Sequence, residues 1–446
     1  MIKMKEYAKT AKEMLEFIEE SPTCFQAVAG LKKLLKKEGF SELKETEDWK
    51  SLEKGGKYYV VRNSSSIIAF HIPTQEKCEG KYRGFHMAAA HSDSPTFKVR
   101  ETAEAASAGN TLRLSVEPYG GGVWRGWLDR PLSVAGRVMI RQGDRLVSRL
   151  VNIDRDLLVI PGVAIHMDRS VNKGAELNPA VDLLPLLGCG KEPGAFRKLI
   201  AEAAGVREEH LLSTELFLYP RTKAVQTGLN GEFIVSPRLD DLQCVFGCLE
   251  GFLAAKPGGS LPVLAVFNNE EVGSSTRQGA DSTFLTDVLE RIAHGCGLDS
   301  EGWKAAVANS FMVSADNAHA IHPAHPEYAD KGEFPVLGGG IVIKYNANQR
   351  YTTDAVSGAV FQAICQEAGV PVQRYSNRAD LPGGSTLGNI STAHLSVPTV
   401  DIGLPQLAMH SVCETAGAAD TEHLVKAMTA YFSRDFHRDR DGGIVF

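Results

Sequence analysis

The pattern that most constrains the fold lies after Pro237, where strand-like and helical segments alternate along the chain. The strand-like segments are LPVLAVFN, FMVSADN, PVQRYS and PTVDIGL. The helical segments are DLQCVFGCLEGFLAA, STFLTDVLERIAHG, TTDAVSGAVFQAICQEAG and TEHLVKAMTAYFSRD. Strands that alternate with helices of this length are typical of a largely parallel sheet with helices on both faces. We therefore expect an α/β fold with a mixed, largely parallel sheet flanked by helices.

The middle of the chain has a different pattern, which predicts an inserted domain. Residues 94–237 consist mainly of strand patterns and turns, with a hairpin signal at Gly143-Asp144 and one clear helical pattern at 194–205. A chain of 446 residues is also too long for one domain of about 100 to 200 residues. We expect residues 1–93 and 238–446 to form one discontinuous α/β domain and residues 94–237 to form a mostly β insertion. The N-terminal part predicts two amphipathic helices within 7–39 and strands at 58–62, 66–72 and 85–91.

Charge and composition exclude several classes of protein. A formal net charge of -6 without a long basic run argues against nucleic acid or an anionic membrane as the partner. The N-terminal residues lack the apolar core of a signal peptide, and no segment approaches the roughly 18 apolar residues of a membrane span. The 8 cysteines form no CxxC pair, and we expect Cys244 and Cys248 to be buried apolar residues rather than metal ligands. These observations predict a soluble, cytoplasmic protein.

Polar residues that end apolar segments form the candidate functional site, because ligands gather at the carboxyl ends of strands in open α/β sheets. The segments concerned are AAAHSDS, SPRLDD, VFNNEEVG, VSADNAH and GLPQLAMHS. They contribute His91, Asp93, Asp240, Asp241, Glu270, Glu271, Asp316 and His410. Histidines and carboxylates at the ends of separate strands indicate a possible metal site.

Each segment has a plainer interpretation when it is taken alone. His91 could be a hydrogen-bonded core histidine, and on local grounds Asp240 is better explained as the N-cap of the helix that follows. Glu270 and Glu271 could lie in a solvated turn, although adjacent residues at a strand end point in different directions and could serve two purposes. As a set, these residues favour zinc, cobalt or manganese, and three carboxylate ligands balance two divalent cations better than one.

The motifs together resemble those of a known family. HSDS, SPRLDDL, FNNEEVGS, VSADNAHAIHP, KYNANQRY and GGSTLG follow the order found in the aspartyl aminopeptidases, which are cytosolic metallopeptidases with two zinc ions. The insertion is similar as well, with GGGVWRGWLDRPLSVAGRV and PGVAIHMDR. The resemblance implies a catalytic domain of the zinc-peptidase type at 1–93 and 238–446 and a dimerisation domain at 94–237. It also implies a tetrahedral homododecamer built from dimers.

The resemblance implies a role for each candidate residue. The metal ligands would be Asp240, which bridges two zinc ions, His91 and Asp316 on one ion, and Glu271 and His410 on the other. Asp93 would orient His91, and Glu270 would be the general base for a water held by the two zinc ions. The Asp240-Asp241 bond falls where related enzymes often have a cis peptide.

The expected reaction is the release of an N-terminal Asp or Glu from peptides with a free N-terminus. Residues that match the substrate-binding positions of the family are His319, Lys344 and His166, the last from a loop that reaches a neighbouring subunit's active site in relatives. Taken alone, Lys344 could be a surface residue, and GGSTLG lacks the lysine of a phosphate-binding loop. The alternatives are an aminopeptidase for neutral residues, a deacylase for N-acyl amino acids, and a catalytically silent metal-binding scaffold.

Overall fold

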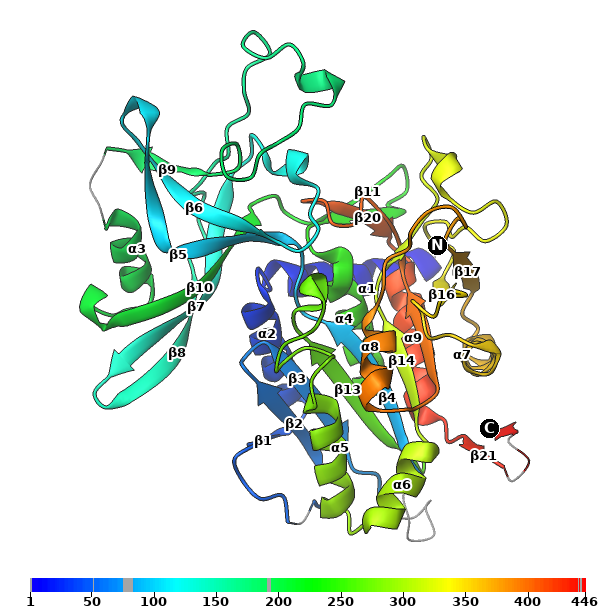
Figure 1. The fold of residues 1–446 in the computed structure, drawn as a ribbon. Helices are drawn as coiled ribbons and strands as arrows, with labels where there is room; N and C mark the ends of the chain where they lie inside the picture. The colour runs from blue at the N-terminus through cyan, green and yellow to red at the C-terminus, as the bar shows by residue number, and fades with distance from the viewer. Residues whose placement is uncertain (1, 51, 75–82, 191–193, 440, 442) are drawn as a thin grey trace.

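A nine-stranded mixed sheet forms the centre of the protein in the computed structural model, which describes all residues except 1, 51, 75–82, 191–193, 440 and 442 (Figure 1). Its strand order is β1-β2-β3-β13-β4-β14-β18-β16-β17. The strands are β1 (Ser41–Leu43), β2 (Lys57–Arg62), β3 (Ser66–His71), β4 (Phe85–His91), β13 (Leu261–Phe267), β14 (Phe311–Ala315), β16 (Ile341–Tyr345), β17 (Val372–Ser376) and β18 (Thr399–Gly403). The central strands β13, β4, β14 and β18 are parallel, whereas β3 and β16 pair with this group antiparallel. The mixed, largely parallel sheet predicted from the sequence is confirmed.

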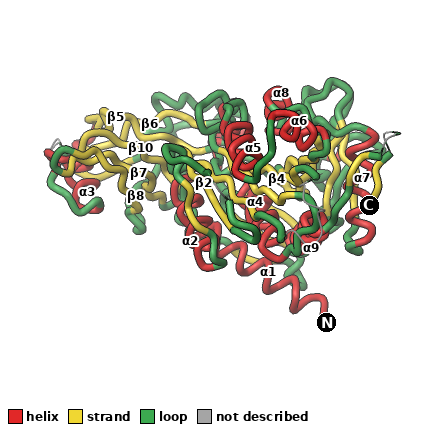
Figure 2. The backbone as a smooth tube through the Cα atoms, turned by 90° about the horizontal axis from the view of Figure 1, so that it is seen from below, coloured by secondary structure: helices red, strands yellow, loops and turns green. Residues whose placement is uncertain are grey.

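Alternate side chains of the central strands pack against helices on the two faces of the sheet. On β4, Ala88 and Ala90 belong to one core and Met87 and Ala89 to another, because successive side chains of a strand point to opposite faces. The first core includes residues of α1 (Ile2–Glu19), α2 (Cys24–Lys37), α4 (Leu239–Ala254), α7 (Ala355–Glu367) and α9 (Asp420–Ser433). The second includes residues of α5 (Phe284–Gly295), α6 (Ser300–Ala308) and α8 (Leu387–His394). Figure 2 shows the two groups of helices on opposite sides of the strands.

The middle of the chain forms a second sheet of six strands in the order β8-β7-β10-β5-β6-β9. All of its neighbouring strands are antiparallel. The strands are β5 (Thr96–Ser107), β6 (Thr111–Tyr119), β7 (Leu132–Gln142), β8 (Arg145–Asn152), β9 (Leu186–Cys189) and β10 (Leu211–Pro220), and α3 (Ala195–Ala203) packs on this core. The predicted hairpin is present, since Gln142 pairs with Arg145 around Gly143. The mostly β character predicted here is confirmed, while the exact domain limits at 94 and 237 stay a prediction.

A small five-stranded sheet joins the end of the predicted insertion to the C-terminal region. Its strands, in order, are β11 (Val225–Thr227), β12 (Phe233–Ser236), β20 (Glu414–Gly417), β19 (Pro405–Leu407) and β15 (Ala318–His319). The short strands β21 (His437–Arg438) and β22 (Ile444–Val445) pair with each other. Because Asp240 follows β12 and His410 lies between β19 and β20, this sheet determines where both residues lie. Among the described helices, none combines the length and the apolar character that a bilayer span requires.

Candidate metal centre and active site

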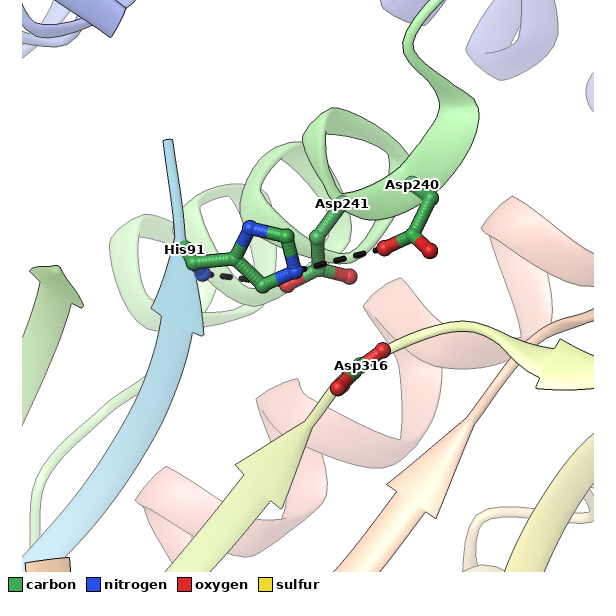
Figure 3. Close-up of side chains that lie close together, drawn as sticks. All are labelled: His91, Asp240, Asp241 and Asp316. Carbon is green, nitrogen blue, oxygen red and sulfur yellow. Dashed lines mark hydrogen bonds and ion pairs between the residues drawn. The ribbon is translucent and has the colours of Figure 1, made fainter. Parts of the chain in front are cut away.

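Three neighbouring central strands end side by side, and each is followed by polar residues. His91 is the last residue of β4, the Glu270-Glu271 pair follows β13, and Asp316 follows β14. Asp240 and Asp241, joined by a cis peptide bond at the start of α4, approach the same place. In Figure 3 the side chains of His91, Asp240, Asp241 and Asp316 gather around one space. The prediction that ends of separate strands meet at one site is therefore realised in the fold.

Asp240 lies between the two histidines of the site. The Nε2 atom of His91 is 3.2 Å from Oδ1 of Asp240, and the Nε2 atom of His410 is 3.4 Å from Oδ2 of Asp240. His410 Nε2 also lies 3.4 Å from Oε2 of Glu271. The interpretation of Asp240 as a helix N-cap is wrong, because Arg238 occupies that position without a side-chain capping bond and the Asp240 carboxylate faces the histidines.

The side chains of this site fit a divalent cation. Their possible ligand atoms lie within 4.8 Å of one another in three groups, which are His91, Asp240, Asp241 and Asp316; His91, Glu270 and Glu271; and Asp240, Glu271 and His410. The Oε1 atom of Glu271 is buried and has no hydrogen-bond partner among the described residues. A buried carboxylate oxygen without a donor is costly unless a cation compensates it. Imidazole nitrogen with carboxylate oxygen is a donor set that suits zinc.

The carboxyl groups of the site strongly perturb one another. Burial raises the pKa of Glu270 to about 8, and the charges of Asp316 and Asp240 add to this effect. Burial also raises the pKa of Glu271 well above its ordinary value, with Asp240 as the main contributing charge. Carboxyl groups packed in this way cannot all ionise without compensation, and a bound cation would provide it.

Asp93 supports the turn that carries the two glutamates. Its Oδ1 atom accepts a hydrogen bond from the backbone N of Glu270 at 3.2 Å, and its Oδ2 atom accepts one from the backbone N of Glu271 at 3.2 Å. The Nδ1 atom of His91 lies 3.0 Å from the Asp93 carbonyl oxygen and 3.5 Å from its Oδ1. The Glu271 side chain is only 2% exposed, so the interpretation of this residue as part of a solvated turn is wrong. Glu270, by contrast, lines an open pocket.

This pocket lies beside the carboxylate cluster and contains two of the three predicted substrate-binding residues, His319 and Lys344. Lys344 is 3% exposed, so its interpretation as a surface residue is wrong. Its Nζ donates to the backbone O of Asn317 at 2.8 Å and lies 3.7 Å from Oδ1 of Asp316. The surrounding protein and the charge of Lys344 lower the pKa of His319 to about 4, so this ring is neutral at neutral pH. Residues 384–386 of the GGSTLG motif also line the pocket.

The third predicted substrate-binding residue, His166, is not among the residues that line this pocket. It lies in an exposed turn of the predicted insertion. A contribution of His166 to the active site of another subunit stays a prediction. Cys244 and Cys248 are both fully buried, in agreement with their expected apolar role.

Two supporting residues were missed by sequence reasoning. Glu414 is buried, and its carboxylate accepts hydrogen bonds from the backbone N of Asp240 at 3.0 Å and from the backbone N of His410 at 2.7 Å. Tyr119 donates its hydroxyl hydrogen to Oδ2 of Asp93 at 2.6 Å. The only local signal for Glu414 is its place four residues after His410. Tyr119 has no local signal, because its partner lies in a distant segment.

Comparison with known proteins identifies the family. The family model for the aminopeptidase I zinc metalloproteases (M18) matches residues 17–432. The chain belongs to the M18 family. A probable M18 family aminopeptidase 2 of Clostridium novyi is 44% identical to it over 437 residues, which are 96% of this chain and 100% of the relative. A probable M18 family aminopeptidase 2 of Pseudomonas aeruginosa is 40% identical over 426 residues, which are 94% of this chain and 97% of the relative.

Solved structures agree with this assignment. A chain in the cryo-EM structure of the Ape4 and Nbr1 complex matches with a TM-score of 0.92 and 37% identity, covering 96% of this M18 chain and 86% of that chain. The S. cerevisiae mApe1 dodecamer matches with a TM-score of 0.83 and 27% identity, covering 96% of this chain and 97% of that chain. This M18 protein is therefore a zinc aminopeptidase, and the family resemblance noted in its motifs is confirmed.

Proposed function

We propose that this M18 aminopeptidase releases N-terminal Asp or Glu from peptides and binds two zinc ions per subunit. The observation that best supports two ions is the position of Asp240, whose Oδ1 atom is near His91 and whose Oδ2 atom is near His410. Asp240 would bridge the ions. His91 and Asp316 would complete the ligands of one ion, and Glu271 and His410 those of the other.

Glu270 is the proposed general base. When bound, the zinc ions would polarise the scissile carbonyl and lower the pKa of the attacking water. Glu270 lines the pocket, where its carboxylate would take the proton of that water and deliver it to the leaving amine. Asp93 would hold the Glu270 backbone in place and fix the ring orientation of His91.

The proposed preference for acidic residues rests on Lys344. Lys344 lines the pocket, and although burial lowers its pKa, the charges around it, with Asp316 first and Asp401 and Asp240 adding to it, together raise the pKa of Lys344, so this group stays charged. A buried cation would pair with the carboxylate of an N-terminal Asp or Glu. His319 would act as a neutral hydrogen-bonding group at pH 7, in view of its lowered pKa.

A second candidate is an aminopeptidase for neutral residues. The charge of Lys344 already has a partner in Asp316 at 3.7 Å, and its Nζ also donates to Asn317. With these two interactions, Lys344 could serve only to hold Asp316 in place and not to bind the substrate. Replacement of Lys344 by Met distinguishes the two candidates, because only an ion pair with the substrate makes the effect depend on the substrate.

The test compares hydrolysis of Asp-, Glu-, Leu- and Ala-p-nitroanilides, with N-acetyl-Asp-p-nitroanilide as the blocked control. Chelation should abolish hydrolysis and zinc should restore it. Lys344→Met should lower kcat/KM for Asp and Glu by roughly 30-fold or more, from the loss of about 2 kcal/mol or more of ion-pair energy. Release of Leu should change far less. Fastest release of Leu by the wild type would contradict the acidic preference, and cleavage of the blocked substrate would contradict the aminopeptidase mechanism.

We also propose that the protein acts in the cytoplasm as a homododecamer. Likeness to the mApe1 dodecamer supports self-association. Light scattering of the zinc-loaded protein measures the mass of the assembly. In a dodecamer, His166→Ala should lower kcat/KM if the exposed turn reaches a neighbouring active site.

A further inference from the structure

One segment of the predicted insertion, residues 119–123, contacts both halves of the candidate metal site. The strand β6 ends at Tyr119, which pairs with Thr96 near the start of β5. Thr96 follows Asp93 by only three residues in the sequence. The end of β6 is therefore brought next to the residues that support His91 and the two glutamates.

Tyr119 links Asp93 to Asn269 through two hydrogen bonds of its hydroxyl group. Its hydroxyl donates to Oδ2 of Asp93 at 2.6 Å and accepts a hydrogen bond from Nδ2 of Asn269 at 2.9 Å. Phe217 packs edge-on against the Tyr119 ring, with 5.5 Å between ring centroids. Burial and the Asp93 charge raise the pKa of Tyr119 far above its ordinary value, so the hydroxyl remains a donor.

The next residues of the segment contact the other half of the cluster. The Nδ1 atom of His410 lies 3.0 Å from the backbone O of Gly121, and the backbone N of Val123 donates to the backbone O of His410 at 2.9 Å. A carbonyl oxygen can only accept, so Nδ1 carries a hydrogen, and Nε2 is the ring nitrogen that faces Asp240. At Gly120, a Cβ atom would lie 3.1 Å from Cβ of Glu271. The segment thus fits closely against both sides of the cluster.

We infer that Tyr119 is a positioning residue of the metal site. Its hydroxyl fixes the Asp93 carboxylate, and Asp93 in turn fixes the His91 ring and the turn that carries Glu270 and Glu271. The catalytic consequence rests on the proposed function, whereas the effect on metal binding does not. Loss of a hydrogen bond to a group that orients a ligand typically weakens metal affinity or activity by about 10- to 100-fold.

The experiment compares Tyr119→Phe with Tyr219→Phe. Both tyrosines lie in the same antiparallel sheet, but the Tyr219 hydroxyl donates to Asn152 at 2.8 Å instead of to the site. Zinc affinity is measured on the full-length protein by competition with a chromophoric chelator, and kcat and KM are measured at saturating zinc. Tyr119→Phe should weaken zinc affinity by about 10-fold or more and lower kcat with little change in KM. Tyr219→Phe should stay within about twofold of the wild type in both measurements.

A double-mutant cycle shows whether Tyr119 acts through Asp93. In an Asp93→Asn background, Tyr119→Phe should change zinc affinity by less than about twofold, because the acceptor that it fixes is already altered. An equal loss of affinity in both backgrounds would overturn the inference. So would a Tyr119→Phe variant that melts at a lower temperature but keeps wild-type zinc affinity. If the wild type binds zinc but hydrolyses no N-terminal residue, the proposed function fails while the affinity results still test Tyr119.

Discussion

Because His86 is buried, we expect the free energy of unfolding to fall at mildly acidic pH. This residue of β4 is 1% exposed, and its ring stacks on Phe436 and Tyr431 with centroid distances of 4.2 Å and 5.3 Å. Its Nε2 atom has no hydrogen-bond partner among the described residues. Burial lowers the pKa of His86 from 6.5 to about 4, because the charged ring would be removed from water.

The sign and size of the effect follow from the two pKa values. The unfolded chain protonates this residue near pH 6.5 and the folded chain near pH 4, so the unfolded state holds more protons between these values. The free energy of unfolding therefore falls as the pH falls through this window. The pKa difference of about 2.5 corresponds to about 3.4 kcal/mol in total, of which about 2 kcal/mol is lost between pH 7 and pH 5.

The assay is equilibrium unfolding in urea at pH 7 and pH 5, with His86→Phe as the test variant. Phe keeps an aromatic ring in the stack but cannot titrate. Between the two pH values the wild type should lose about 2 kcal/mol more than this variant, because titrations shared by both proteins cancel in the difference. His325→Phe is the control, since the His325 side chain is 56% exposed, and it should follow the wild type. Equal losses in the wild type and His86→Phe would refute the reasoning.

Four further substitutions test the site and its scaffold. Glu270→Gln should lower kcat by about 10²- to 10⁴-fold with unchanged zinc content, whereas Glu271→Gln should lose zinc on dialysis; full hydrolysis by both variants would contradict the assigned roles. Glu414→Gln can accept only one of the two backbone N–H groups, so urea denaturation should show a loss of about 1–3 kcal/mol together with weaker zinc binding. At Gly251 of α4 a Cβ atom would lie 2.4 Å from Cβ of Met428 in α9. Gly251→Ala should therefore lower the free energy of unfolding by about 1–3 kcal/mol. An unchanged urea midpoint would contradict this prediction, because it would mean that α4 and α9 can move apart to admit the methyl group at no cost.

The fold could be predicted from the sequence where hydrophobic periodicity extends over several residues. The apolar segments that form β4, β13, β14 and β18 are long enough to predict a parallel sheet, and the charged or histidine residues at the ends of β4, β13 and β14 mark where the site lies. The five-stranded sheet could not be predicted in the same way. Its strand β15 contains two residues, and β11 and β19 contain three each. Strands so short carry no periodic signal, and their pairing depends on distant parts of the chain.

The site residues also differ in how far each could be predicted from the sequence. His91 and Asp316 could be predicted because the first ends a buried strand and the second directly follows one, so the sheet alone determines where they lie. Asp240 required the complete set of motifs, because the local pattern of an acidic residue before a helix equally describes an N-cap. The structure resolves this competition, since the Asp240 side chain faces two histidines that are distant in the sequence.

His410 shows why the rest of the site could not be predicted from residue types. It lies in a loop with a positive φ of 65°, which a residue with a side chain rarely adopts without support. Part of that support comes from backbone groups of the predicted insertion, since Gly121 accepts from the His410 ring and Val123 donates to its carbonyl, and part comes from Glu414, which accepts from the His410 backbone N. Backbone groups are the same in every residue, so no sequence pattern marks the ones that hold a ligand.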